Sequence, residues 1–151
     1  MKVDTKAVLR DVFPRMLEEL TFLFADNSDG KASLPGDAVL VNIAFSGPFH
    51  GTLDMSIARS LGIEMASNLL GLDPEDTNAQ RAGDDALREL MNVTCGHVLT
   101  GIAGSEPVFN LSIPTVRPIG AEEWDALGAA ADVVIFEVDG RPVQLCVKIE
   151  E

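Results

Sequence analysis

The chain has 151 residues, the length of one compact domain, and 46% of them are hydrophobic, which is enough to fill a core without disulfides or a structural metal. Its 11 basic and 24 acidic residues give a formal net charge of −13. This charge disfavours sequence-independent binding to nucleic acid or anionic lipid, because phosphate groups need cationic partners. We therefore predict a single domain over residues 1–151 that binds neither nucleic acid nor a membrane.

The chain contains two cysteines, Cys95 and Cys146, which are too few for a disulfide scaffold and lack the CxxC spacing of a zinc or redox site. The N-terminal residues carry Asp4 and Asp11 within an apolar pattern, unlike a signal peptide, and no run of 18 apolar residues could span a membrane. A cytoplasmic protein with reduced thiols is expected.

The first predicted element is an amphipathic helix, because apolar residues recur at steps of three and four after the capping residue Asp4. It is expected to reach about residue 25, with a kink or a break at Pro14. Residues 26–37 are rich in turn formers and predict a loop.

The middle of the chain predicts a β-hairpin and two helices. Branched apolar residues at 38–46 and alternation at 51–58 flank Gly47-Pro48, which favours a hairpin. Helical spacing returns over residues 59–72, where Gly71 is a stop signal, and residues 80–103 form the longest helical candidate.

The C-terminal part predicts strands. Residues 107–113 read as a strand that Pro114 ends, and residues 118–128 are expected to be irregular. A second hairpin is predicted from residues 132–138 and 141–149, joined by Asp139-Gly140.

This order of elements predicts an α+β fold, with helices packed on a mostly antiparallel sheet. The last strand offers an edge that could pair with a second copy in a homodimer, whereas Lys148, Glu150 and Glu151 could instead protect that edge. The sequence leaves the oligomeric state open.

The helix over residues 85–102 carries the most information. A helical wheel places one apolar stripe toward the core: Leu87, Leu90, Met91, Thr94, Val98 and Ile102. The opposite side carries a row at steps of four, three and four: Asp85, Glu89, Asn92 and Gly96. Below, these four residues are called the outward row.

Two properties of the outward row point to a partner. Gly96 costs the helix about 1 kcal/mol relative to alanine, which close approach of another surface would explain. The Asn92 amide both donates and accepts, so it can orient a water, whereas the Glu89 carboxylate accepts hydrogen bonds or pairs with a cation. The alternative is a solvated face, with Arg88 and the acids keeping the helix soluble and the glycine packing on another helix.

The stretch Asp85-Ala86-Leu87-Arg88-Glu89-Leu90-Met91-Asn92-Val93-Thr94-Cys95-Gly96 resembles the signature of the CheC/CheX/FliY family of chemotaxis phosphatases. In that signature Asp or Ser is followed by Glu four residues later, Asn three residues after that, and then a glycine. Pro114 lies within one residue of the place where the family pattern has a distal proline. The order of elements along nearly the whole chain is also compatible with the fold of that family.

The resemblance is to a CheX-like member. CheC-type members carry the signature in two pseudo-symmetric helices, whereas here Glu18 and Glu19 are followed at plus three by Thr21 and Phe22 instead of Asn. One departure is His97, where many relatives have Asn.

The resemblance implies dephosphorylation of a CheY-like response regulator, in chemotaxis or another two-component system. By position, Asn92 would orient the attacking water and Glu89 would pair with a regulator lysine, with Asp85, Arg88 and Gly96 as partner-binding residues. The chain would hold no metal or cofactor of its own, and the phosphorylated receiver would supply Mg²⁺. In-line phosphoryl transfer gains most from alignment and electrostatics, which agrees with these roles.

Two other functions stay open: a non-catalytic adaptor that binds a receiver or a flagellar-switch protein, and a domain whose motif is vestigial. For Asp85, capping of the helix N-terminus is an equal alternative to a direct role. His50 and His97 lack further ligands at metal-site spacing, Cys95 is predicted to be a buried inert thiol, and Trp124 is expected to pack or to lie at an interface.

Overall fold

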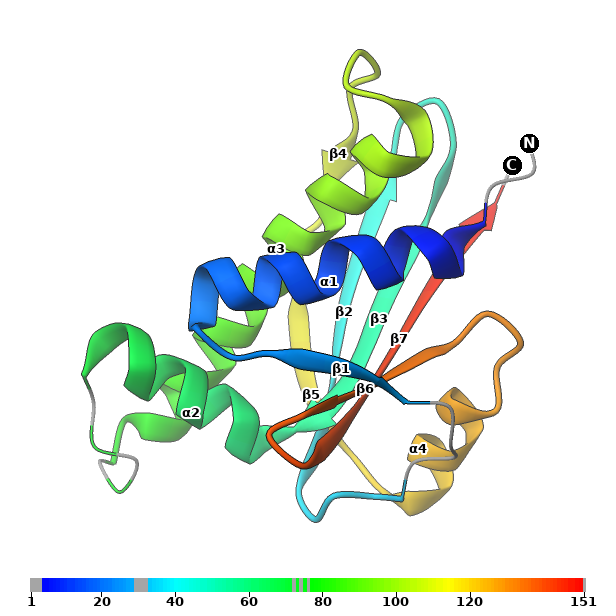
Figure 1. Ribbon diagram of the computed structural model, residues 1–151. Helices are drawn as coiled ribbons and strands as arrows, with labels where there is room; N and C mark the ends of the chain where they lie inside the picture. The colour runs from blue at the N-terminus through cyan, green and yellow to red at the C-terminus, as the bar shows by residue number, and fades with distance from the viewer. Residues whose placement is uncertain (1–3, 29–32, 72, 74, 76, 151) are drawn as a thin grey trace.

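The computed structural model describes residues 4–28, 33–71, 73, 75 and 77–150 (Figure 1). The helices are α1 (Thr5–Thr21), α2 (Arg59–Leu70), α3 (Ala79–Ala103) and α4 (Ala121–Gly128). The strands are β1 (Ala25–Ser28), β2 (Ala38–Ser46), β3 (His50–Ala58), β4 (Asn110–Leu111), β5 (Thr115–Ile119), β6 (Val134–Val138) and β7 (Arg141–Glu150).

The strands form one sheet in the order β1-β6-β7-β3-β2-β4, and β5 pairs with β2 on the same side as β4. All these pairs are antiparallel. The predicted α+β fold, with helices on a mostly antiparallel sheet, is therefore confirmed.

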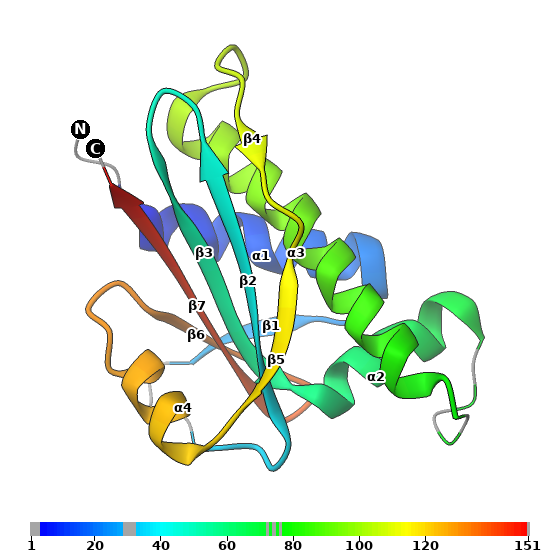
Figure 2. The same ribbon diagram turned by 180° about the vertical axis from the view of Figure 1, so that it is seen from behind.

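One face of the sheet makes the main core. Its inward residues alternate along the strands, as in Leu53, Met55 and Ile57 of β3, and they pack with residues from α1, α2 and α3 in one cluster. Figure 2, seen from behind, shows the sheet in front of α1 and α3. The other face carries Gln144 and Cys146, and α4 lies against it near Gln144.

The first helix is shorter than predicted. It ends at Thr21, because Phe22 adopts a left-handed conformation with φ 64° and its N–H donates to the Glu18 carbonyl. Pro14 lies inside this single helix without splitting it. The predicted loop over residues 26–37 is wrong at its start, because residues 26–28 belong to β1, which pairs with β6.

Two further corrections concern the segment after α3. The predicted strand 107–113 is limited to Asn110–Leu111. The region expected to be irregular, 118–128, holds the end of β5 and all of α4, in which Trp124 is fully buried. Arg117 of β5 donates from Nη1 to Glu123 Oε1 at 2.9 Å, which joins these two elements.

The C-terminal hairpin is confirmed, and Asp139 and Gly140 both have positive φ, as a tight hairpin turn requires. The last strand is not the free edge that the dimer hypothesis assumed. β7 pairs with β3 over residues 143–150 and with β6 over residues 141–145. Within β7, among the described residues, 146–150 extend past the end of β6 and have no neighbouring strand on that side.

Candidate functional site

Helix α3 is held in place by close packing against α2. A Cβ added at Gly83 would lie 2.8 Å from the Ile63 backbone nitrogen, so only glycine allows this approach of the two backbones. Arg59 of α2 also pairs with Asp84 of α3 through Nη1 at 3.1 Å, with both side chains mostly buried. Sequence reasoning missed this ion pair, because nothing in the spacing of residues 59 and 84 links them.

The predicted apolar stripe of α3 faces the core. Five of its six residues are buried: Leu87, Leu90, Met91, Thr94 and Val98. Ile102 is partly buried and packs against the same cluster.

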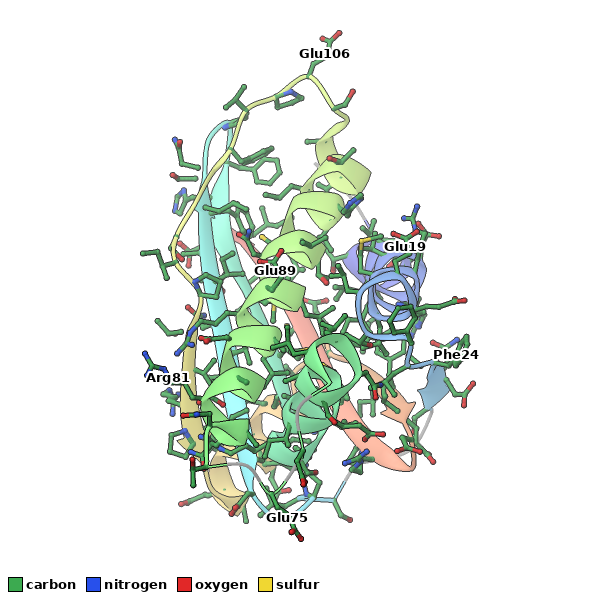
Figure 3. The ribbon with its side chains drawn as sticks, turned by 90° about the vertical axis from the view of Figure 1, so that its left-hand side faces the viewer. Glu19, Phe24, Glu75, Arg81, Glu89 and Glu106 are labelled. Carbon is green, nitrogen blue, oxygen red and sulfur yellow. The ribbon has the colours of Figure 1, made fainter. Side chains whose placement is uncertain are left out.

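The outward row lies on the opposite side, as the helical wheel predicted. Asp85, Glu89 and Asn92 are exposed, and Gly96 is half-buried. Figure 3 shows Glu89 projecting from α3, while Glu19 lies apart from it on α1. Among the described residues, none forms a hydrogen bond or an ion pair with the side chains of Glu89 and Asn92, so both are available to a partner.

Asp85 and Arg88 are engaged with each other. Arg88 Nη1 lies 2.8 Å from Asp85 Oδ1, an exposed pair one turn apart of the kind that contributes about 0.3–0.5 kcal/mol. The N-cap of α3 is Asn78, so Asp85 lies in the second turn of the helix. The helix dipole acts on charges in the first turn only. The capping interpretation of Asp85 is therefore wrong.

The outward row continues toward the N-terminus to Arg81, four residues before Asp85, which sequence reasoning missed although the same step of four predicts it. Arg81 and Arg88 line an open polar hollow of about 560 Å³ together with Thr77, Gln80, Asp84 and Asp85. Figure 3 shows Arg81 near the start of α3. Cationic and anionic groups thus alternate along this side of the helix.

Gly96 differs from Gly83 and Gly101, the other two glycines of α3, because no neighbouring helix among the described residues packs against it. A Cβ added at Gly101 would meet Val8 of α1 at 2.9 Å, whereas one added at Gly96 would meet nothing within 4 Å. Packing on another helix therefore explains Gly101 and Gly83 and does not explain Gly96.

The buried side of α3 offers no reactive thiol. Burial raises the pKa of Cys95 to about 12, so the thiol stays protonated and inert at neutral pH, as predicted. Both cysteines are buried and free. Among the described residues, no group of three His, Cys, Asp or Glu side chains could hold a metal ion. The described helices also include none with an apolar stretch of the length that a membrane span needs.

The fold and the outward row define a class of protein: an α+β domain that presents, on one side of a helix, a carboxylate and an amide that bond to no other described residue. A family model described as chemotaxis phosphatase CheX matches residues 39–136, which include the whole outward row. The chain belongs to this CheX family of chemotaxis phosphatases.

Solved structures agree on the fold. The chain is similar to CheX in a CheX–CheY–BeF3–Mg²⁺ complex from Borrelia burgdorferi, with 19% identity, coverage of 99% of this chain and 100% of that one, and a TM-score of 0.71. It is similar to the chemotaxis protein CheX of Vibrio vulnificus, with 18% identity, coverage of 99% and 100%, and a TM-score of 0.74. A CheC-like superfamily protein from Shewanella sp. PV-4 gives 21% identity, coverage of 100% of both chains and a TM-score of 0.68. No curated protein gives a significant match.

Proposed function

We propose that this chain hydrolyses the aspartyl phosphate of a CheY-like receiver domain, with Asn92 orienting the attacking water and Glu89 holding the receiver. The observation that carries the proposal is a pair of side chains, three residues apart on the outward side of α3, that no described residue bonds. Membership of the CheX family supports the reaction, and the Borrelia burgdorferi complex supports a receiver as its partner.

The chemistry of an amide suits the role of Asn92. Its carbonyl oxygen accepts a hydrogen bond from a water, and its NH₂ group donates to a phosphoryl oxygen, so one side chain fixes both reactants. The water oxygen bonds to phosphorus as the bond from phosphorus to the receiver carboxylate breaks. Both water protons end on the released phosphate, and no covalent intermediate forms on this chain.

Glu89 lies one turn before Asn92 on the same side of the helix, so both side chains reach the same partner surface. A free carboxylate there can pair with a cation of the receiver, such as a lysine beside its phosphorylation site. The expected role of Glu89 is therefore docking and orientation.

The outward row does not fit a resident Mg²⁺ ion, because Asp85 is engaged by Arg88 and Glu89 is left as one carboxylate. We therefore assign any Mg²⁺ to the receiver and derive no step from an ion on this chain. In the Borrelia burgdorferi complex, Mg²⁺ is present together with CheY.

The test follows phosphate loss from receivers of the same cell, with Mg²⁺, with and without catalytic amounts of this protein. Asn92→Ala is expected to lower kcat by about 100-fold or more, the usual cost of removing one preorganised group. Glu89→Ala is expected mainly to raise KM, by about tenfold or more, because a charged hydrogen bond to the receiver is lost.

Matched control variants come from the same chain. Asn27 of β1 and Glu19 of α1 are exposed and lie on other elements, so Asn27→Ala and Glu19→Ala should leave turnover unchanged. Full turnover by Asn92→Ala would remove this residue from the mechanism. Binding of phosphorylated receiver without faster phosphate loss would instead favour the adaptor function.

A further inference from the structure

The edge segment after α3, residues 105–114, exposes two large apolar side chains. Val108 is 79% exposed and Ile113 is 84% exposed, the highest values among the exposed large hydrophobic residues that the structure describes. Other exposed apolar residues, such as Leu70, lie on different elements. The high exposure of two such residues within six positions favours a contact surface.

A β-bulge presents Ile113. Phe45 pairs with Leu111 and Asn42 pairs with Thr115, so two residues of β2 face three residues of the edge segment. Ser112 fixes one side of the bulge, because its N–H donates to the Ala44 carbonyl at 2.8 Å and its Oγ accepts from the Ala44 N–H at 2.9 Å. Ile113 lies inside this bulge, has no register partner on β2 and is exposed.

Aromatic contacts fix the edge segment at Phe109. The rings of Phe45, Phe49 and Phe109 lie with centroids 5.0 to 6.2 Å apart in edge-to-face arrangements. These contacts anchor Phe109, the neighbour of Val108, on β2 and on the turn that follows it.

A hollow joins the edge segment to the outward row. It has a volume of about 170 Å³ and is lined by Gly96, Leu99, Thr100, Gly104, Pro107, Phe109 and Leu111. Gly96 belongs to both the hollow and the outward row, and it lies one turn, about 6 Å, from Asn92. Figure 2 shows the segment from β4 to β5 running beside α3, and α3 contacts β5.

A receiver bound at Asn92 has to contact more of this chain than α3 alone, because protein interfaces are large. A stable interface covers about 800 Å² on each partner, more than one side of a single helix offers. A receiver whose phosphorylation site lies on Asn92 must also cover the flanks of α3. On the flank toward the sheet edge, it meets the hollow and the bulge.

A second copy of this chain suits the surface less well than a receiver does. Pairing of sheet edges needs a regular row of free N–H and C=O groups, and the bulge together with Pro114 and Pro118 interrupts that row. The edge segment also lines the hollow that reaches Gly96 of the outward row, where the proposed reaction requires the receiver to bind.

We infer that the exposed side chains of Val108 and Ile113 and the hollow beside Gly96 form a docking site for the receiver, in which side chains outside the reaction centre set its affinity. The inference rests on the proposed function, because it takes the receiver as the partner of the outward row. Binding energy from such contacts lowers KM without altering the chemical step.

The test compares Ile113→Ser and Val108→Ser with Leu70→Ser, a matched exposed apolar residue of α2 that is 66% exposed. Both edge variants should raise KM for the phosphorylated receiver by about tenfold, the usual effect of one buried aliphatic side chain, with kcat unchanged within twofold. Leu70→Ser should leave both constants unchanged. Equal melting temperatures would show that the variants fold.

Binding to receivers carrying BeF3 is measured alongside turnover, for wild type and each variant. Weaker binding by Ile113→Ser supports the docking site even without turnover, in which case only the proposed catalysis fails. Unchanged KM and binding, with activity still lost in Asn92→Ala, would overturn the docking site alone. A change in self-association without a change in receiver binding, or an equal effect of Leu70→Ser, would also overturn it, and no binding to any receiver would overturn both proposals.

Discussion

The substitution Gly96→Ala separates the needs of the fold from the needs of the partner. The added Cβ would meet no atom within 4 Å, and Gly96 lies inside α3, more than four turns from the first residue and about two turns from the last. Alanine in a helix interior is more stable than glycine by about 1 kcal/mol, because glycine loses more backbone entropy on folding. We therefore expect Gly96→Ala to stabilise the isolated protein by up to about 1 kcal/mol.

The same methyl group should impair the reaction. It would project from the outward row one turn from Asn92, into the space that the receiver is proposed to fill. Because a displacement of about 1 Å can cost about 100-fold in rate, we expect kcat/KM toward the phosphorylated receiver to fall by about tenfold or more. Stability and activity should thus change in opposite directions.

Thermal unfolding and the decay of receiver phosphate measure the two effects. For a chain of this length, 1 kcal/mol corresponds to a rise in Tm of about 2–4 °C. Gly83→Ala is the matched comparison on the same helix: its Cβ would lie 2.8 Å from the Ile63 nitrogen, so this variant should lower Tm. A lower Tm for Gly96→Ala would show that the fold itself requires the glycine, and a higher Tm with unchanged kcat/KM would show that no partner approaches it.

Two other predictions concern the buried side of α3. The Thr94 hydroxyl is buried without a hydrogen-bond partner among the described residues. Thr94→Val should therefore raise the free energy of unfolding, measured by urea titration, by about 1 kcal/mol. A loss of stability would instead indicate that the hydroxyl has a partner such as a buried water. Burial raises the pKa of Cys95 to about 12 in the folded state, whereas the unfolded thiol titrates near 9. The folded state therefore binds more protons between these values, and stability should fall as pH rises above 9, by up to about 1.4 kcal/mol per pH unit. Urea titrations at pH values from 8 to 11 measure how the free energy of unfolding changes with pH. The same pH dependence in wild type and in Cys95→Ala would refute the prediction.

The outward row was predictable because it depends on local geometry. Residues at steps of three and four share one side of any helix, so Glu89 and Asn92 could be placed together before the fold was known. Their exposure followed from the apolar stripe opposite them, since Leu87 and Met91 must face a core. The same rule would have added Arg81.

The elements that sequence reasoning missed depend on pairing between distant segments. β1 has the sequence ADNS, which favours turns, and it becomes a strand because Ala25–Ser28 pairs with β6 more than 100 residues later. The edge segment was predicted as one strand over 107–113, but the bulge that divides it is defined by its register against β2. No local pattern states a register, so neither feature could be derived from the residues alone.

A mechanism of positioning places a demand on residues far from the receiver. An amide accelerates hydrolysis only if its helix holds it in place while the receiver binds, because a misaligned water loses most of the advantage. Gly83 provides close contact with α2, and the Arg59–Asp84 pair, with both side chains mostly buried, fixes the rotation of α3 against that helix. These groups touch no substrate in the proposed reaction. They fix the backbone of α3 at Asn92 in the folded chain, so binding of the receiver has to order only the exposed side chain.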